Sequence, residues 1–128
     1  MILALLLLAQ AAPPPAAPSP DADEVVVIAN RLRGWSGTYR DTLGIKTCRT
    51  KTSTGDAEID RIGCSALLAC FAPARTKLEA ATKAAGRDKA ARAAAVEPIN
   101  REMTACFKER RTTMIAELVA ARRARKRG

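Results

Sequence analysis

Histidine is absent from this 128-residue sequence, and aromatic residues are scarce. Without histidine the chain lacks the commonest general base and the commonest metal ligand, and a Ser-His-Asp triad is excluded. The only aromatic side chains are Trp35, Tyr39, Phe71 and Phe107. Alanine supplies much of the apolar content, and an alanine-rich core buries little area per residue. The single domain that this length allows therefore needs close backbone packing or covalent cross-links.

Other patterns typical of enzymes and cofactor sites are also missing. There is no glycine-rich phosphate loop, and residues 34–37 (Gly-Trp-Ser-Gly) lack the spacing of a nucleophile elbow. No C-x-x-C pair is present, which argues against a zinc site and against a redox-active pair. The carboxylates of Asp56, Glu58 and Asp60 are interpreted as capping a helix and complementing its dipole. We therefore expect no enzyme activity, no cofactor and no metal site.

The first residues have the features of a secretory leader. Residues 2–9 form an apolar run, and Ala9-Gln10-Ala11 fits a cleavage site with small flanking residues. The run is too short to span a bilayer, so no transmembrane segment is expected. No Lys or Arg precedes it, so either the leader is atypical or the true start lies upstream; the alternative is an apolar helix of the fold. We predict a signal peptide at residues 1–11, and a periplasmic or secreted protein.

A spacer and several β-prone segments follow the leader. Residues 12–24 are rich in proline and alanine and end in acidic side chains, which predicts a disordered spacer. The β-branched run at residues 25–29 predicts a strand, and two further strands are expected around residues 38–43 and 45–52. These strands would form a small element of two or three strands, which cannot be stable alone.

The second half of the chain has helical periodicity. Asp56 is a good N-cap, and the apolar residues after it repeat with helical spacing. Pro73 interrupts this stripe and should cause a kink or a tight restart, and Gly86 is the next expected break. After an alanine-rich, helix-favouring stretch, Pro98 interrupts again and fits the first turn of a final helix.

The four cysteines are Cys48, Cys64, Cys70 and Cys106, an even set that favours two disulfides in an exported chain. Three pairings exist, and helix geometry discriminates among them. If the chain reverses near Gly86, Cys70 and Cys106 lie at similar distances from the turn on facing apolar stripes. Cys64 points elsewhere on its helix and is free to pair with Cys48 on the last strand. The predicted pairs are therefore Cys48–Cys64 and Cys70–Cys106.

Together these patterns predict a mainly α fold. A small two- or three-stranded β element is followed by a disulfide-stapled helical hairpin. One small domain should extend over residues 25–121, with strands within 25–52 and helices within 56–121. A basic tail is expected at residues 122–128.

One segment resembles a motif of a known family. Residues 23–31 (Asp-Glu-Val-Val-Val-Ile-Ala-Asn-Arg) resemble the TonB box near the mature N-terminus of TonB-dependent outer-membrane receptors. In that family the segment adds as a strand to an energy-coupling protein, so the resemblance implies a partner strand at Val25, Val26, Val27 and Ile28. The remainder departs from the receptors, because no plug and no large barrel can follow in about a hundred residues. The whole layout resembles small exported proteins of Gram-negative bacteria, which carries no activity with it.

Positive charge is concentrated in the C-terminal half. The net charge is +9, yet residues 1–74 hold seven Lys or Arg and seven Asp or Glu, so the whole excess lies after residue 74. This asymmetry indicates either an anionic partner or a solvated helix. The candidate anion-binding residues are those of the basic tail, namely Arg122, Arg123, Arg125, Lys126 and Arg127.

These observations favour an exported structural or interaction protein of the cell envelope, whose partner is an unidentified protein or envelope component. The alternative is an anion-binding protein that uses the basic C-terminal helix and tail on anionic lipid, lipopolysaccharide or nucleic acid. Nucleic acid is the weakest of these, because export argues against it and the tail has no aromatic side chain on which bases could stack.

Overall fold

The computed structural model of the protein describes residues 12–13 and 20–128. The predicted signal peptide lies outside these residues. The expected mainly α fold, with a small β element followed by a disulfide-stapled helical hairpin, is confirmed. In chain order the elements are α1 (Pro20–Arg33), β1 (Ser36–Thr42), β2 (Ile45–Thr52), α2 (Ala57–Ala66), the π-helical turn η1 (Leu67–Phe71), α3 (Ala72–Ala85) and α4 (Lys89–Arg127).

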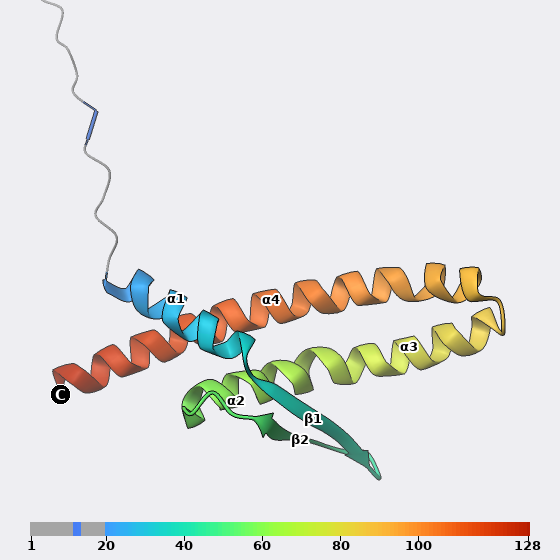
Figure 1. The fold of residues 1–128 in the computed structure, drawn as a ribbon, viewed down its shortest axis with the longest axis horizontal. Helices are drawn as coiled ribbons and strands as arrows, with labels where there is room; N and C mark the ends of the chain where they lie inside the picture. Colours follow the sequence, from blue (N-terminus) through green and yellow to red (C-terminus); the bar gives the residue numbers. More distant parts are fainter. Residues whose placement is uncertain (1–11, 14–19) are drawn as a thin grey trace, which may run out of the picture.

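Two long helical segments run antiparallel and define the shape of the molecule (Figure 1). α2, η1 and α3 follow one another and lie along α4, and the chain reverses between α3 and α4 at Gly86, as predicted. α4 has 39 residues, which corresponds to about 58 Å. α1 crosses α4 towards its C-terminal half, and the β1–β2 hairpin lies against α2 and η1.

The hydrophobic core lies at one end of the molecule, where α1, α2 and α4 meet. Its buried residues are Ile28, Leu32, Ile59, Ile62, Ile115, Leu118 and Val119. Between residues 75 and 114, all of which the structure describes, no residue is fully buried. The far part of the α3–α4 hairpin is therefore a pair of alanine-rich helices without a core of its own.

The strand predicted at residues 25–29 is wrong, because this segment belongs to α1. The helix also includes residues 20–24, which were expected to be part of the disordered spacer. Val25, Ile28, Ala29 and Leu32 have the helical spacing i, i+3, i+4, i+7, and they face the core. Acidic residues in the first turn and basic residues in the last turn complement the helix dipole. Burial of this apolar stripe outweighs the β preference of the valines.

One of the two helical prolines has the effect that the sequence predicts, and the other does not. Pro73 lies in the first turn of α3, directly after η1, which confirms the predicted tight restart. Pro98 was expected to start the final helix, but α4 begins at Lys89 and continues through it. The Asp88 carboxylate accepts hydrogen bonds from the backbone N–H groups of Ala90 and Ala91, which fixes the earlier start. The alanine-rich residues 90–96 have high helix propensity, which offsets part of the cost of the backbone donor that Pro98 lacks.

Two strands rather than three make up the sheet in the described part of the chain. β1 and β2 pair antiparallel through a two-residue turn at Leu43 and Gly44, with Thr42 opposite Ile45. Both turn residues have positive φ, 53° at Leu43 and 81° at Gly44. This is the geometry of a type I′ turn, whose twist matches that of the flanking strands.

Candidate interaction surfaces

Both predicted disulfides are confirmed. Cys48–Cys64 joins β2 to α2, with 5.5 Å between the Cα atoms, and Cys70–Cys106 joins η1 to α4, with 5.7 Å between them. The second bridge ties the two long helical segments together where the core ends. The first bridge fastens the hairpin to the helices.

Trp35 attaches the base of the hairpin. Its indole ring packs against the backbone at Gly37 and Gly63, where a Cβ atom on either residue would collide with the ring. The indole Nε1 donates a hydrogen bond to Thr50 Oγ1 at 3.1 Å. Trp35 is thus held between β1 and α2 by shape and by one directed hydrogen bond.

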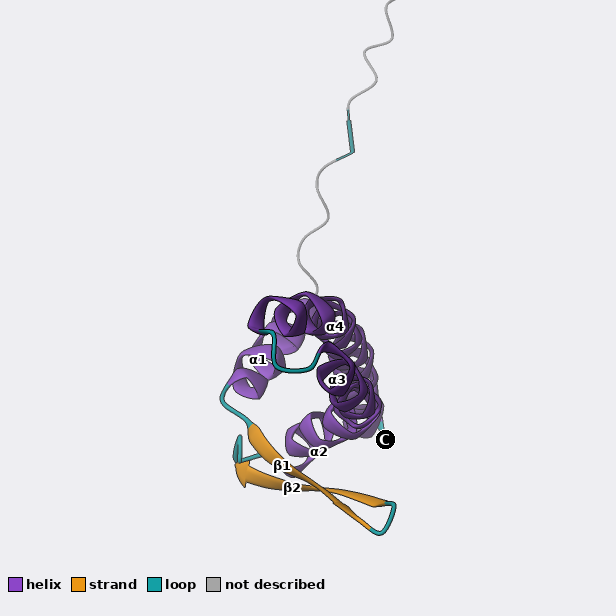
Figure 2. Cartoon of the chain, turned by 90° about the vertical axis from the view of Figure 1, so that its right-hand side faces the viewer, coloured by secondary structure: helices purple, strands orange, loops and turns teal. Residues whose placement is uncertain are grey.

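The middle of the hairpin rests on η1 and α3. Tyr39 meets Phe71 edge to face, with ring centroids 5.3 Å apart. The guanidinium of Arg75 lies 5.6 Å from the centroid of the Tyr39 ring. Together with Trp35 and the Cys48–Cys64 bridge, these contacts fix the root and middle of the hairpin, while its turn projects away from the helices (Figure 2).

The hairpin tip, defined as Leu43, Gly44 and Ile45, is apolar and exposed. Leu43 is 98% exposed and Ile45 is 68% exposed. The Gly44 N–H donates to the Asp41 carboxylate at 3.1 Å, which holds the turn. Type I′ turns favour Asn, Asp or Gly, and a left-handed backbone at another residue costs about 1–3 kcal/mol. Neither conformational preference nor burial accounts for a leucine at residue 43.

Positive side chains lie behind this tip. Arg40, Lys46 and Arg49, here called the basic collar, are all exposed. Tyr39 and Cys48 lie opposite each other on the inner face of the hairpin. Arg40 and Arg49 alternate with them along the strands, so they share the face that turns away from the helices. Their cross-strand partners on that face are Thr47 and Thr38. A depression of about 340 Å³ on the hairpin is lined by both arginines together with Thr38, Thr47 and Cys48. None of the collar residues forms an ion pair with a residue that the structure describes.

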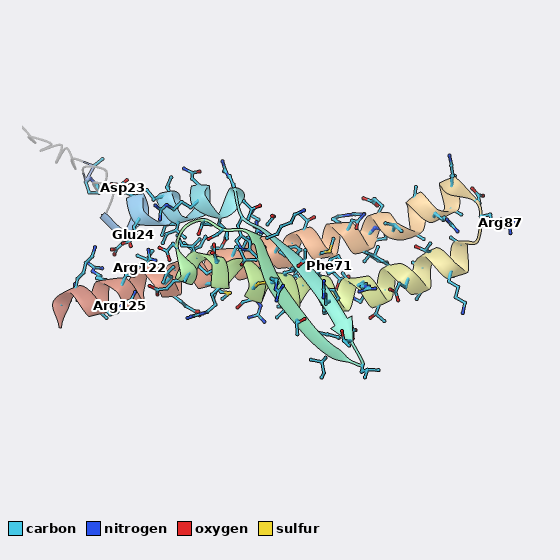
Figure 3. The ribbon with its side chains drawn as sticks, turned by 60° about the horizontal axis from the view of Figure 1, so that its bottom comes forward. Asp23, Glu24, Phe71, Arg87, Arg122 and Arg125 are labelled. Carbon is cyan, nitrogen blue, oxygen red and sulfur yellow. A yellow bond between two sulfur atoms is a disulfide. The ribbon has the colours of Figure 1, made fainter. Side chains whose placement is uncertain are left out.

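The predicted basic tail is not a separate segment, because α4 continues to Arg127. Three of the five candidate anion-binding residues carry ion pairs with carboxylates of other helices or caps. Arg122 contacts Asp56 at 2.5 Å, and Arg125 contacts Glu58 at 2.9 Å. Both arginines lie on the C-terminal part of α4 (Figure 3). Arg123 contacts Asp21 at 2.6 Å. Lys126 and Arg127 form no ion pair within the described residues, so they alone among the five keep unneutralised charge.

Asp56 is the centre of this charge network. Its carboxylate caps α2 by accepting hydrogen bonds from the backbone N–H groups of Glu58 and Ile59, and it also contacts Arg122. Burial opposes ionisation of Asp56, but the hydrogen bonds from Arg122 and from the two backbone N–H groups outweigh it and hold its pKa below the ordinary value. The same pairing raises the pKa of Arg122. These charges stabilise the junction of α2 and α4.

The segment predicted as a partner strand is split between core and surface. Ile28 is 1% exposed within the core, whereas Val26 and Val27 are 56% and 55% exposed on the outer side of α1. Pairing as a strand would require α1 to unfold and Ile28 to leave the core. The structure therefore does not present Val25–Ile28 as an edge strand.

Sequence reasoning missed the hairpin tip as a site. The available signal was the dipeptide Leu43-Gly44 between two β-prone segments, where an Asn-Gly or Asp-Gly turn is expected. A leucine there is anomalous by local preference. The 98% exposure of its side chain could be learned only from the structure.

Over residues 12–13 and 20–128, no helix has the length and apolar character needed to cross a membrane. In the same residues, no group of three or more acidic or cysteine side chains is placed to bind a metal ion. Comparison of the chain with protein-family models, with curated proteins and with solved structures found no match.

Proposed function

We propose that this protein is an exported interaction protein of the cell envelope, and that the β1–β2 hairpin is its contact element. One observation carries the proposal. The hairpin holds an almost fully exposed leucine, Leu43, in a backbone conformation that disfavours leucine. Burial against a partner offsets that conformational cost, whereas folding alone does not.

The covalent chemistry supports the proposed compartment. Disulfides persist in oxidising compartments outside the cytoplasm, and all four cysteines of this chain are paired. The apolar run and the small residues at positions 9 and 11, which have the pattern of a signal peptide, also support export. The proposed role is binding rather than catalysis, because the sequence offers no nucleophile–base pair.

The alternative, an anion-binding C-terminal helix and tail, is less well supported. Arg122, Arg123 and Arg125 are already neutralised by carboxylates of the same molecule. An external anion would have to compete with these pairs. Deletion of residues 122–128 should therefore lower the stability of the fold, since it removes the partner of Asp56.

The first test is the intact mass of the native protein from fractionated cells, with and without reductant. We expect the chain in the envelope fraction, lacking its first eleven residues and lighter by the four hydrogens of two disulfides. A full-length chain with free thiols in the cytoplasmic fraction would contradict export and the proposal with it.

The second test concerns the contact element. A Leu43→Asn, Ile45→Thr double variant should be exported and oxidised normally but should move from the envelope to the soluble fraction. The matched control is Val26→Thr with Val27→Thr, which removes comparably exposed apolar side chains from α1 and should leave the protein in the envelope fraction. Retention of the hairpin variant would show that another surface makes the contact.

A further inference from the structure

We infer that the partner of the hairpin is the surface of an anionic lipid bilayer, into which Leu43 and Ile45 insert while the basic collar binds lipid phosphates. This inference rests on the proposed function and adds the chemistry of the partner. Its support comes from the order of residue types along the hairpin, from the scarcity of carboxylates on it, and from the direction in which the hairpin projects.

Residue types follow the depth profile of a membrane interface. A strand rises about 3.3 Å per residue, so Lys46 and Arg40 lie about 7–10 Å behind the turn. Apolar side chains of peripheral proteins enter the interface by about 5–10 Å. With Leu43 at that depth, both basic side chains reach the level of the lipid phosphates. Arg49 lies further back, within a Debye length of the surface at physiological salt.

Few negative charges oppose this contact. Asp41 is the only acidic residue between residues 36 and 52, against four basic ones, so the hairpin carries a net charge of +3. The Asp41 carboxylate accepts the Gly44 N–H and thus serves the turn itself. An anionic surface attracts the hairpin and draws its apolar tip first, because the tip projects furthest from the helices (Figure 2).

Nucleic acid fits the hairpin less well. Single-stranded nucleic acid is bound through aromatic side chains on which bases stack, and Tyr39, the hairpin strands' only aromatic residue, is engaged with Phe71 and Arg75. A nucleic-acid site also has no use for an exposed leucine and isoleucine at the tip. Lipid is the partner that uses the tip and the collar together.

The test uses the purified, disulfide-intact protein and two kinds of vesicle, phosphatidylcholine alone and phosphatidylcholine mixed with phosphatidylglycerol. A Leu43→Trp variant reports insertion, because Trp35 of the parent is held between Gly37 and Gly63, away from the tip. We expect a blue shift and quenching by brominated lipid with the anionic vesicles only. No spectral change and no co-sedimentation would overturn the inference.

Substitutions separate a binding role from a structural one. Leu43→Asn should weaken partitioning about ten-fold, yet keep or raise the melting temperature, because asparagine suits the type I′ turn. Arg40→Gln with Lys46→Gln should weaken it about twenty-fold at low salt, with the difference shrinking as salt is added. Val26→Thr with Val27→Thr is the control and should bind like the parent. Vesicle binding that is unchanged by Leu43→Asn would overturn insertion of the tip.

The outcomes distinguish failure of this inference from failure of the proposed function. If the protein binds neither kind of vesicle but its retention in the envelope fraction still depends on the tip, the partner is a protein or glycan. In that case only the lipid assignment is wrong. If it binds duplex DNA through Arg40 and Lys46, with no effect of Leu43→Asn and no vesicle binding, the partner is nucleic acid. If retention in the envelope fraction does not depend on the tip, both this inference and the proposed function are wrong.

Discussion

At the scale of single residues, Gly63 is where helix and hairpin come closest. The indole ring of Trp35 covers it, and a Cβ at this position would collide with the ring. Gly63→Ala should therefore lower the free energy of unfolding by about 1–3 kcal/mol, the usual range for overpacking. Chemical denaturation followed by circular dichroism measures it. Gly34→Ala is the matched control, because a Cβ there meets its nearest atom, the Arg31 carbonyl oxygen, at an ordinary 3.5 Å. Equal effects of the two substitutions would contradict the packing argument.

Asp56 links stability to pH. Its pKa in the folded protein lies below the ordinary value of 3.8, so its ionised form stabilises the fold. That stability is fully present above the unfolded-state pKa and is lost as the pH falls through the lower, folded-state value. We expect the melting temperature to be insensitive to this group above about pH 5 and to decrease below about pH 4.

The measurement is a series of thermal melts of the parent and of Asp56→Asn across acidic pH. The variant should melt lower at neutral pH and show a shallower decrease on acidification. Asp60, whose pKa is lowered by hydrogen bonds from Ser53 and from the Thr54 backbone N–H, should leave a residual decrease in both proteins. Glu109→Gln, which changes an exposed carboxylate of α4 without an ion pair in the described residues, should behave like the parent. Parallel curves for parent and Asp56→Asn would refute the assignment.

At the scale of elements, the two disulfides contribute unequally to the stability of the fold. Cys70–Cys106 closes a loop with a sequence separation of 36, and Cys48–Cys64 one with a separation of 16. The chain-entropy relation gives about 4 kcal/mol for the longer loop and about 3 kcal/mol for the shorter. For a core of seven buried residues these are large contributions. The Cys70→Ser, Cys106→Ser double variant should thus be less stable than the Cys48→Ser, Cys64→Ser double variant.

Denaturant midpoints of the two double-serine variants, each with its remaining bridge intact, check this order. Near-ultraviolet circular dichroism of Trp35 adds a second signal. It should change in Cys48→Ser, Cys64→Ser, where the hairpin loses its covalent link, more than in the other variant. A Cys70→Ser, Cys106→Ser protein that unfolds like the parent would show that helix packing alone holds the long hairpin.

At the scale of the whole molecule, stability should be unevenly distributed. The core joins α1, α2 and the C-terminal half of α4, whereas residues 75–114 include no fully buried residue. Regions with few buried apolar contacts open at low free energy. Amide hydrogen exchange should therefore be faster over residues 80–100 than over residues 112–122 of the same helix pair. Uniform protection along α4 would indicate that residues 80–100 are covered, for example by a second copy of the chain.

Part of the candidate site could be predicted from the sequence. The β1–β2 segments and the turn between them could be predicted, because β-prone runs and a glycine mark them locally. The exposure of Leu43 and the lack of an ion pair at Arg40 and Arg49 within the described residues could not, because they depend on where α2, η1 and α3 lie. For the same reason the basic residues Arg122, Arg123 and Arg125 looked available in the sequence but are paired in the structure.

Local patterns by themselves determined the mainly helical architecture, the reversal at Gly86 and both disulfide pairs. Each of these depends on helical period and on distances along one hairpin, which a sequence encodes directly. Only the tertiary structure decided that residues 25–29 are helical and that α4 reaches from Lys89 to Arg127. The β preference of three valines is worth little beside burying Ile28 and Leu32 against residues about thirty and ninety positions away. Contacts of that range outweigh local propensity, and no local pattern reports them.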